Sequence, residues 1–195
     1  MPTMIFFETI KCKNYNTFNI SYHKARVVRT IGLNINIEEY IYPPNKNKMK
    51  CNIIYDENEI LFVEYKKYDK KVIKSFYLIY DNDIKYDKKF LNRNNINTLY
   101  EKRGDCDEII IVKNKLITDT SIANIAIKYN QRWITPAKPL HKGTTRQRLI
   151  ESKQLYEKDI SVDMLKNSEK IALLNAMIGF DKNYNKDMIC PKIKT

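Results

Sequence analysis

The chain has 195 residues, of which 43% are hydrophobic and 30% charged. This length and composition are sufficient for one large globular domain or two small lobes, and no stretch approaches the roughly eighteen uninterrupted apolar residues of a membrane span. The first residues lack the basic, apolar and small-residue regions of a signal peptide. We therefore expect a cytoplasmic protein that is neither exported nor inserted in a membrane.

Basic residues are in excess, with a formal net charge of +12, but they do not cluster. Lysines are spread over the whole chain and arginines are few, whereas specific nucleic-acid binding usually needs a basic stripe. We expect a solvated basic surface and no nucleic-acid partner, with a basic binding module as the alternative. The four cysteines (Cys12, Cys51, Cys106 and Cys190) have no metal or redox spacing, so we expect them to be reduced and to bind no metal.

The first part of the chain alternates apolar and polar residues, which predicts strands. Expected strands are 4–13, 17–23, 50–56, 59–68 and 72–80, arranged as an antiparallel sheet. A helix is expected at 23–33, with Ala25, Val28 and Ile31 or Leu33 on its apolar face and Gly32 near its end. This part is therefore predicted to be α+β.

Beyond a charged connection near residues 81–95, the pattern changes to short elements. We expect a helix at 96–104, strands at 107–114, from Leu116 onward and at 132–140, then a helix from Thr144 and an apolar strand within 169–180. Thr144 and Thr145 are candidate caps of the second helix.

Two motifs are suited to binding an anion. "GTTRQR" places Gly143 before a helix start, where unpaired backbone N–H groups and two hydroxyls can face a phosphate, although a plain helix cap is an equal alternative. "HKAR" places His23 and Arg26 on one helical face, and a surface arginine is the simpler interpretation of it.

Taken together, five segments resemble the class IV aminotransferase-like family, the fold-type IV pyridoxal-phosphate enzymes that include 4-amino-4-deoxychorismate lyase. The segments are "FETIKCKNYNTFNISYHKAR", "KFLNR", "LITDTSIANIAI", "WITPAKPLHKGTTRQRLIE" and "LLNAMIGF". The match is strongest to the short, lyase-like members.

The resemblance implies the roles of particular residues. Lys89 matches the lysine that holds pyridoxal 5'-phosphate, with Lys85 and Lys88 as neighbours that could be mistaken for it. Asp119 matches the acid, usually Glu, that pairs with the ring nitrogen. The implied phosphate contacts are Arg26, Gly143, Thr144 and Thr145, and the last active-site turn corresponds to Asn175 and Ala176.

The implied fold is α+β with two lobes, a small amino-terminal lobe (1–86) and a larger barrel-like carboxyl lobe (87–195) that is short for the family, with the cofactor at their junction. The implied assembly is a homodimer. The implied activity is conversion of 4-amino-4-deoxychorismate to 4-aminobenzoate and pyruvate. A class IV aminotransferase of branched-chain or D-amino acids remains an alternative, because the substrate pocket decides between the two reactions. An inert cofactor-binding relative is a further alternative, because Asp replaces Glu and the chain is short.

Overall fold

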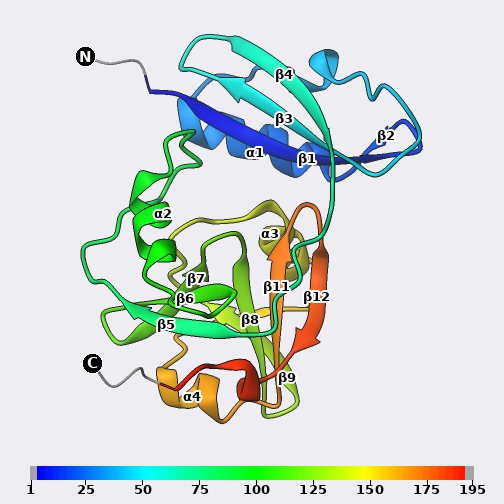
Figure 1. Ribbon diagram of the computed structural model, residues 1–195. Helices are drawn as coiled ribbons and strands as arrows, with labels where there is room; N and C mark the ends of the chain where they lie inside the picture. Colours follow the sequence, from blue (N-terminus) through cyan, green and yellow to red (C-terminus); the bar gives the residue numbers. More distant parts are fainter. Residues whose placement is uncertain (1–3, 192–195) are drawn as a thin grey trace. The chain divides into compact units, whose positions relative to one another are not determined.

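The computed structural model describes residues 4–191, which form two compact units. The first unit comprises the chain up to Lys70 together with Lys88–Arg93, and the second comprises Lys71–Asp87 and the chain from Asn94 onward. The chain thus passes between the units three times, whereas we expected a single boundary after residue 86. The mixed α+β class with two sheets and few helices is confirmed (Figure 1).

The first unit contains one antiparallel sheet and one long helix. Its elements are β1 (Phe6–Lys13), β2 (Asn16–Thr17), α1 (Ile20–Ile31), the 3-10 helix η1 (Ile37–Tyr40), β3 (Met49–Tyr55) and β4 (Ile60–Lys67). The strand order is β2-β1-β3-β4. Alternate residues of β1 and β3 are buried, as the sequence alternation predicted.

Helix α1 differs from the prediction in its start and in its buried face. The strand expected at 17–23 is wrong, because the chain reverses at Asn14 and Tyr15, both with positive φ, and the helix begins at Ile20. The buried residues of α1 are His23, Arg26, Val27 and Thr30, whereas Ala25 and Val28 are exposed. The predicted apolar face was therefore wrong, because this helix buries polar side chains.

The segment Lys88–Arg93 follows the edge of β1. Phe7 N–H donates to the carbonyl of Lys89, and Leu91 N–H donates to the carbonyl of Ile5, at 3.0 and 2.9 Å. An isolated bridge joins Phe6 and Phe90. The charged connection expected in this region is therefore fixed, at its centre, to the sheet of the first unit.

The second unit contains an eight-stranded sheet with three short helices. Its elements are β5 (Phe76–Tyr80), α2 (Asn94–Glu101), β6 (Glu108–Lys113), β7 (Leu116–Thr120), β8 (Asn124–Tyr129), β9 (Arg132–Pro136), α3 (Thr144–Glu151), β10 (Tyr156–Lys158), α4 (Val162–Lys166), β11 (Lys170–Asn175), β12 (Gly179–Tyr184) and the 3-10 helix η2 (Lys186–Met188). The order is β10-β9-β8-β7-β6-β5, and β11 pairs with both β8 and β12.

Strand β5 was expected in the antiparallel sheet of the first part, and this was wrong. It pairs in parallel with β6, from Phe76 opposite Glu108 to Tyr80 opposite Val112. A parallel pair needs a crossover connection. The long segment between the two strands, which contains α2, supplies it.

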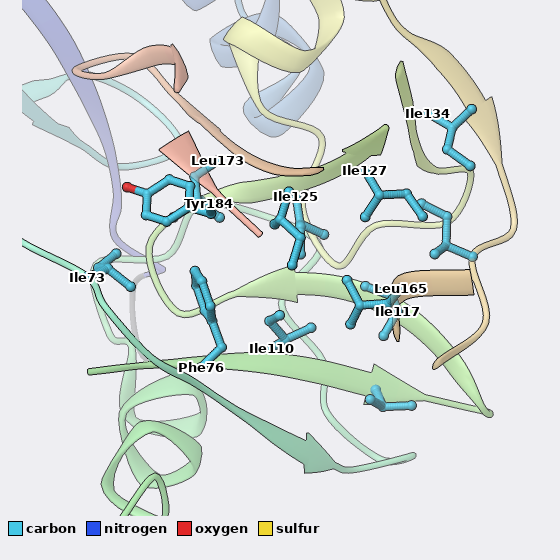
Figure 2. Packing of buried hydrophobic residues seen from close by; sticks show 14 residues of the cluster. Ile73, Phe76, Ile110, Ile117, Ile125, Ile127, Ile134, Leu165, Leu173 and Tyr184 are labelled. Atoms are coloured by element: carbon cyan, nitrogen blue, oxygen red, sulfur yellow. The ribbon is translucent and has the colours of Figure 1, made fainter. Parts of the chain in front are cut away.

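The core of the second unit is aliphatic. Figure 2 shows side chains from β5 to β8, β11, β12 and α4 packed together; the fully buried ones include Phe76, Ile110, Ile125, Ile127, Leu165, Ile171 and Leu173. Each such side chain contributes about 1.5 to 3 kcal/mol when removed from water. Within residues 4–191, no helix is long and apolar enough to cross a membrane.

The expectation of four reduced cysteines was wrong for two of them. Cys106 and Cys190 form a disulfide that closes a loop with a sequence separation of 84 residues. Cys12 and Cys51 are free and buried in the sheet of the first unit. Spacing in the sequence did not reveal the disulfide, because its two cysteines are brought together only by the fold.

Candidate functional site

A buried ionic cluster joins strand β1 to helix α1 in the first unit. Glu8 lies on the inner side of β1 and accepts hydrogen bonds from Arg26, with Nε at 2.7 Å from Oε1 and Nη2 on Oε2. His23 Nδ1 lies 2.5 Å from Oε2 of the same carboxylate. The side chains of Glu8 and His23 are fully buried. The structure therefore places Arg26 inside the unit and pairs it with an acid.

The charge states of this cluster follow from its surroundings. Burial alone would raise the pKa of Glu8, but the positive charge of Arg26 and the hydrogen bond from His23 lower it well below its usual range. Burial lowers the pKa of His23, although Glu8 opposes this effect. A neutral His23 that donates from Nδ1 and an ionised Glu8 paired with Arg26 are therefore expected at neutral pH.

Lys89 lies beside this cluster. Burial and the nearby positive charge of Arg26 lower its pKa to about 7, with Glu8 opposing and Arg93 and Lys50 adding to the decrease. Its ammonium nitrogen is 4.2 Å from the ring centre of Phe7. The lowered pKa of Lys89 favours the uncharged amine, which is the nucleophilic form of lysine.

The neighbouring lysines have different surroundings. Lys88 Nζ donates to the carbonyl of Thr30 at 2.9 Å, so this side chain helps to close the last turn of α1. Lys85 belongs to the second unit and is exposed. The pKa of Lys89 is lowered to about 7 by its own surroundings.

Asp119 lies within strand β7 of the second unit and is 5% exposed. Its Oδ1 accepts from Nδ2 of Asn124 at 2.6 Å, and its Oδ2 accepts from the backbone N–H of His141 at 3.1 Å. Burial raises its pKa to about 7, although these hydrogen bonds oppose the increase. A carboxylate has about four acceptor positions, so it can accept one more N–H.

The amino terminus of α3 lies next to Asp119 in the same unit. Gly143 is the residue before the helix, and its N–H donates to Oδ1 of Asn124 at 3.1 Å. The first helical hydrogen bond runs from Gln147 N–H to the carbonyl of Gly143, so the N–H groups of Thr144 and Thr145 precede the helical ladder. Those two groups are therefore better placed for an anion than that of Gly143.

The expected capping role of the two threonines was wrong. The cap residue of α3 is Gly143, which has no side chain that could accept from the first N–H groups of the helix. Thr145 is 1% exposed, and its Oγ1 has no hydrogen-bond partner among the described residues. An unsatisfied buried hydroxyl costs about 1 to 3 kcal/mol, so its retention in the first turn of a helix favours a ligand oxygen as its partner.

Arg146 holds α3 in place and was not singled out from the sequence. Its side chain is 1% exposed, and Nη2 donates to the carbonyl of Pro136 at 2.8 Å and to Oε1 of Glu157 at 2.6 Å. The helix is thereby joined to β9 and β10. The positive charge of Arg146 also lowers the pKa of Asp119 slightly.

Asn175 and Ala176 lie at the turn after β11. Asn175 Oδ1 accepts from the N–H groups of Met177 and Ile178 at 2.9 and 3.0 Å. Its Nδ2 donates to the carbonyl of Ile122 at 3.3 Å, which joins this turn to the turn that comes after Asp119. Ala176 is partly buried.

The candidate residues fit the chemistry of pyridoxal phosphate within each unit. The first unit offers an amine with a pKa near 7 and a buried guanidinium. The second offers a buried acid and a helix amino terminus with an unsatisfied hydroxyl, and they are joined by Asn124. These are the groups needed to bind an aldehyde, a pyridine nitrogen and a phosphate.

The sequence did not identify Glu8 or Asn124 as residues of the candidate site. The alternation of β1 places Glu8 between the inward-facing Phe6 and Ile10, and a lone acid at an inward position signals a buried cation. Asn124 gave no such signal, because its partners at 141–143 come from a later loop.

Comparison with known proteins gives a consistent result. A sequence model of amino-transferase class IV matches residues 64–180. An uncharacterized protein of Haemophilus influenzae is 33% identical over 184 residues, which cover 89% of this chain and 97% of that protein. The crystal structure of a "putative 4-amino-4-deoxychorismate lyase" from Haemophilus somnus has a TM-score of 0.84 and 30% identity and covers 92% of this chain and 99% of that one.

A more distant structure shares the fold. The pyridoxal-phosphate-bound form of a hypothetical aminotransferase from Mycobacterium tuberculosis has a TM-score of 0.78 at 14% identity and covers 98% of this chain and 84% of that one. The two Haemophilus proteins are matched over nearly their whole length, so the shortness of this chain is shared with them. The chain belongs to the class IV aminotransferase family.

Proposed function

We propose that this protein is a pyridoxal-phosphate-dependent lyase that converts 4-amino-4-deoxychorismate to 4-aminobenzoate and pyruvate. The observation that carries the proposal is the pKa of about 7 at Lys89, which lies next to Arg26 in the position matched to the cofactor-binding lysine. The similarity to the Haemophilus somnus protein supports the choice of a lyase.

When bound, pyridoxal phosphate supplies an electron sink for the electrons released at the substrate Cα. Lys89 is assigned to hold the cofactor at rest and, once displaced by the substrate amine, to remove the proton from Cα. A group with a pKa near the working pH exchanges protons efficiently in both directions. The lowered pKa of Lys89 therefore suits it to both tasks.

Asp119 is assigned to the ring nitrogen. Its carboxyl is buried and can form a hydrogen bond with the ring nitrogen in which the two groups share one proton. Asn124 and the N–H of His141 hold the carboxylate while leaving acceptor positions for this contact.

The phosphate is assigned to two groups. In the second unit, the N–H groups of Thr144 and Thr145 and the hydroxyl of Thr145 donate hydrogen bonds to the phosphate dianion at the positive end of α3. In the first unit, Arg26 contributes a guanidinium that Glu8 holds on one side. Asn175 and Ala176 are assigned to the turn that forms one wall of the cofactor site.

An aminotransferase is the second candidate, because the matched sequence model is that of amino-transferase class IV. Both reactions begin with removal of the Cα proton by Lys89 and differ in their later steps. The lyase reaction would release pyruvate and the aromatic 4-aminobenzoate, whereas the aminotransferase reaction would consume water and release a keto acid, with the amino group left on the cofactor. The proposal also includes a homodimer and a cytoplasmic location.

The experiment is an assay of the purified protein with pyridoxal phosphate and 4-amino-4-deoxychorismate. The expected products are 4-aminobenzoate and pyruvate in equal amounts, and Lys89→Ala should form neither. A keto acid formed from a branched-chain or D-amino acid, with no 4-aminobenzoate, would support the aminotransferase instead. Absence of both activities in a protein that binds the cofactor would identify an inert relative.

A further inference from the structure

Three groups of the second unit meet at one side chain, the amide of Asn124. Its Nδ2 donates both to Oδ1 of Asp119 and to the carbonyl of His141, each at 2.6 Å. Its Oδ1 accepts from the N–H of Gly143 at 3.1 Å. The residue is 6% exposed, so these protein contacts satisfy a buried amide.

The orientation of this amide is determined on both sides. A rotated amide would place its oxygen against the carboxylate of Asp119 and the carbonyl of His141, and its NH₂ group against the N–H of Gly143. All three contacts would then be repulsive. The register of the sheet also places Asn124 directly opposite Asp119, across strands β7 and β8.

Gly143 is shaped to receive the amide. A Cβ atom at this position would lie 2.1 Å from Oδ1 of Asn124, which is far inside van der Waals contact. The φ of Gly143 is −72°, so glycine is needed here for space and not for its backbone freedom. The start of α3 can therefore approach β8 closely only while residue 143 lacks a side chain.

We infer that Asn124 is a positioning residue that fixes the carboxyl group of Asp119 relative to the amino terminus of α3. Through this amide, a change in the protonation of Asp119 is transmitted to the backbone N–H of Gly143. Only the role of this linkage rests on the proposed function: it would hold the contacts for the ring nitrogen and for the phosphate in one arrangement. The linkage itself is a property of the protein without cofactor.

The test monitors the backbone amide NMR signal of Gly143 while pH is raised from 5 to 9 in cofactor-free protein. Burial raises the pKa of the Asp119 carboxyl to about 7, and Arg146 is the nearby fixed charge. The Gly143 signal should follow the Asp119 carboxyl signal with the same midpoint. In Asn124→Ala, this response of Gly143 should be lost, and the midpoint of Asp119 should rise, because a hydrogen bond that lowers its pKa is removed.

Two further variants separate positioning from simple destabilisation. Gly143→Ala displaces the amide from the other side and should also raise the midpoint of Asp119. Thr135→Val removes a buried hydrogen bond to the carbonyl of Ile125 in the same sheet, and it should lower stability without moving that midpoint. Asn124→Ala should also weaken pyridoxal-phosphate binding about tenfold.

The outcomes distinguish the inference from the proposed function. The linkage would be overturned if the Gly143 amide signal did not change with the titration of Asp119 in the wild type, or if it still changed with it in Asn124→Ala. This conclusion would hold whether or not the cofactor binds. A wild type that transmits the titration but does not bind pyridoxal phosphate would leave the linkage standing and would contradict the proposed function.

Discussion

Glu8 and Arg26 form a two-point ion pair in the interior of the first unit, where β1 meets α1. Both side chains are almost completely buried, and His23 donates to the same carboxylate. Such pairs contribute little relative to apolar packing, but removal of one partner leaves an uncompensated charge. The pair therefore fixes the position of Arg26 and sets part of the electrostatic surroundings of Lys89.

Glu8→Gln should destabilise the protein strongly. It preserves the shape of the side chain but leaves the buried guanidinium of Arg26 without a counter-charge, which typically costs about 3 to 5 kcal/mol. The folded-state pKa of Glu8 is below its usual value, so its contribution is present above that usual value and is lost as pH falls. Urea unfolding at several pH values measures both effects.

The matched control is Glu64→Gln. Glu64 is also a sheet residue, but it lies on the open side of β4, with Asn52 and Lys66 as partners. Exposed pairs contribute at most about 1 kcal/mol. Equal losses for the two variants would show that the cluster of Glu8 is no more important than a surface pair.

Asp119→Asn should make the protein more stable at alkaline pH. The folded-state pKa of Asp119 is raised from 3.8 to about 7, so its favourable contribution is complete below pH 3.8 and is lost as pH rises through 7. A shift of about three units corresponds to roughly 4 kcal/mol. The wild type should lose this stability between about pH 4 and pH 7, and the variant should not.

The same variant should slow turnover by orders of magnitude, because an amide cannot hold the ring nitrogen protonated. Cofactor affinity should fall much less. Turnover of 4-amino-4-deoxychorismate at saturating cofactor measures this effect. Equal rates for the two proteins would show that Asp119 only accepts local N–H groups and has no role toward the ring nitrogen.

Thr145→Val should separate ligand binding from stability. Valine has the shape of threonine without the hydroxyl, and Oγ1 of Thr145 has no partner within the described residues. The cofactor-free protein should therefore be as stable as the wild type or more so, whereas pyridoxal-phosphate affinity should fall about tenfold or more through loss of a bond to a charged oxygen. Thr145→Ser restores the hydroxyl and should recover affinity. A lower melting temperature in Thr145→Val would indicate that the hydroxyl has a structural partner.

The sequence predicted most elements, because strand alternation is preserved wherever one face is buried, as in β1 and β3. It failed at α1, where three of the four buried residues, His23, Arg26 and Thr30, are polar and carry no apolar signal. It failed at β5 because alternation does not specify a partner strand. Lys89 and Asp119 could be named from motifs, but their pKa values of about 7 come from neighbours that only the fold provides.

The central claim is that Lys89 binds pyridoxal phosphate covalently. The most direct measurement is reduction of the protein–cofactor complex with borohydride, followed by peptide mapping of the modified lysine. We predict that the purified complex is yellow and that the modification is found on Lys89, whose pKa is lowered to about 7. Modification of Lys85 or Lys88, or a protein that acquires no cofactor under saturating conditions, would contradict it.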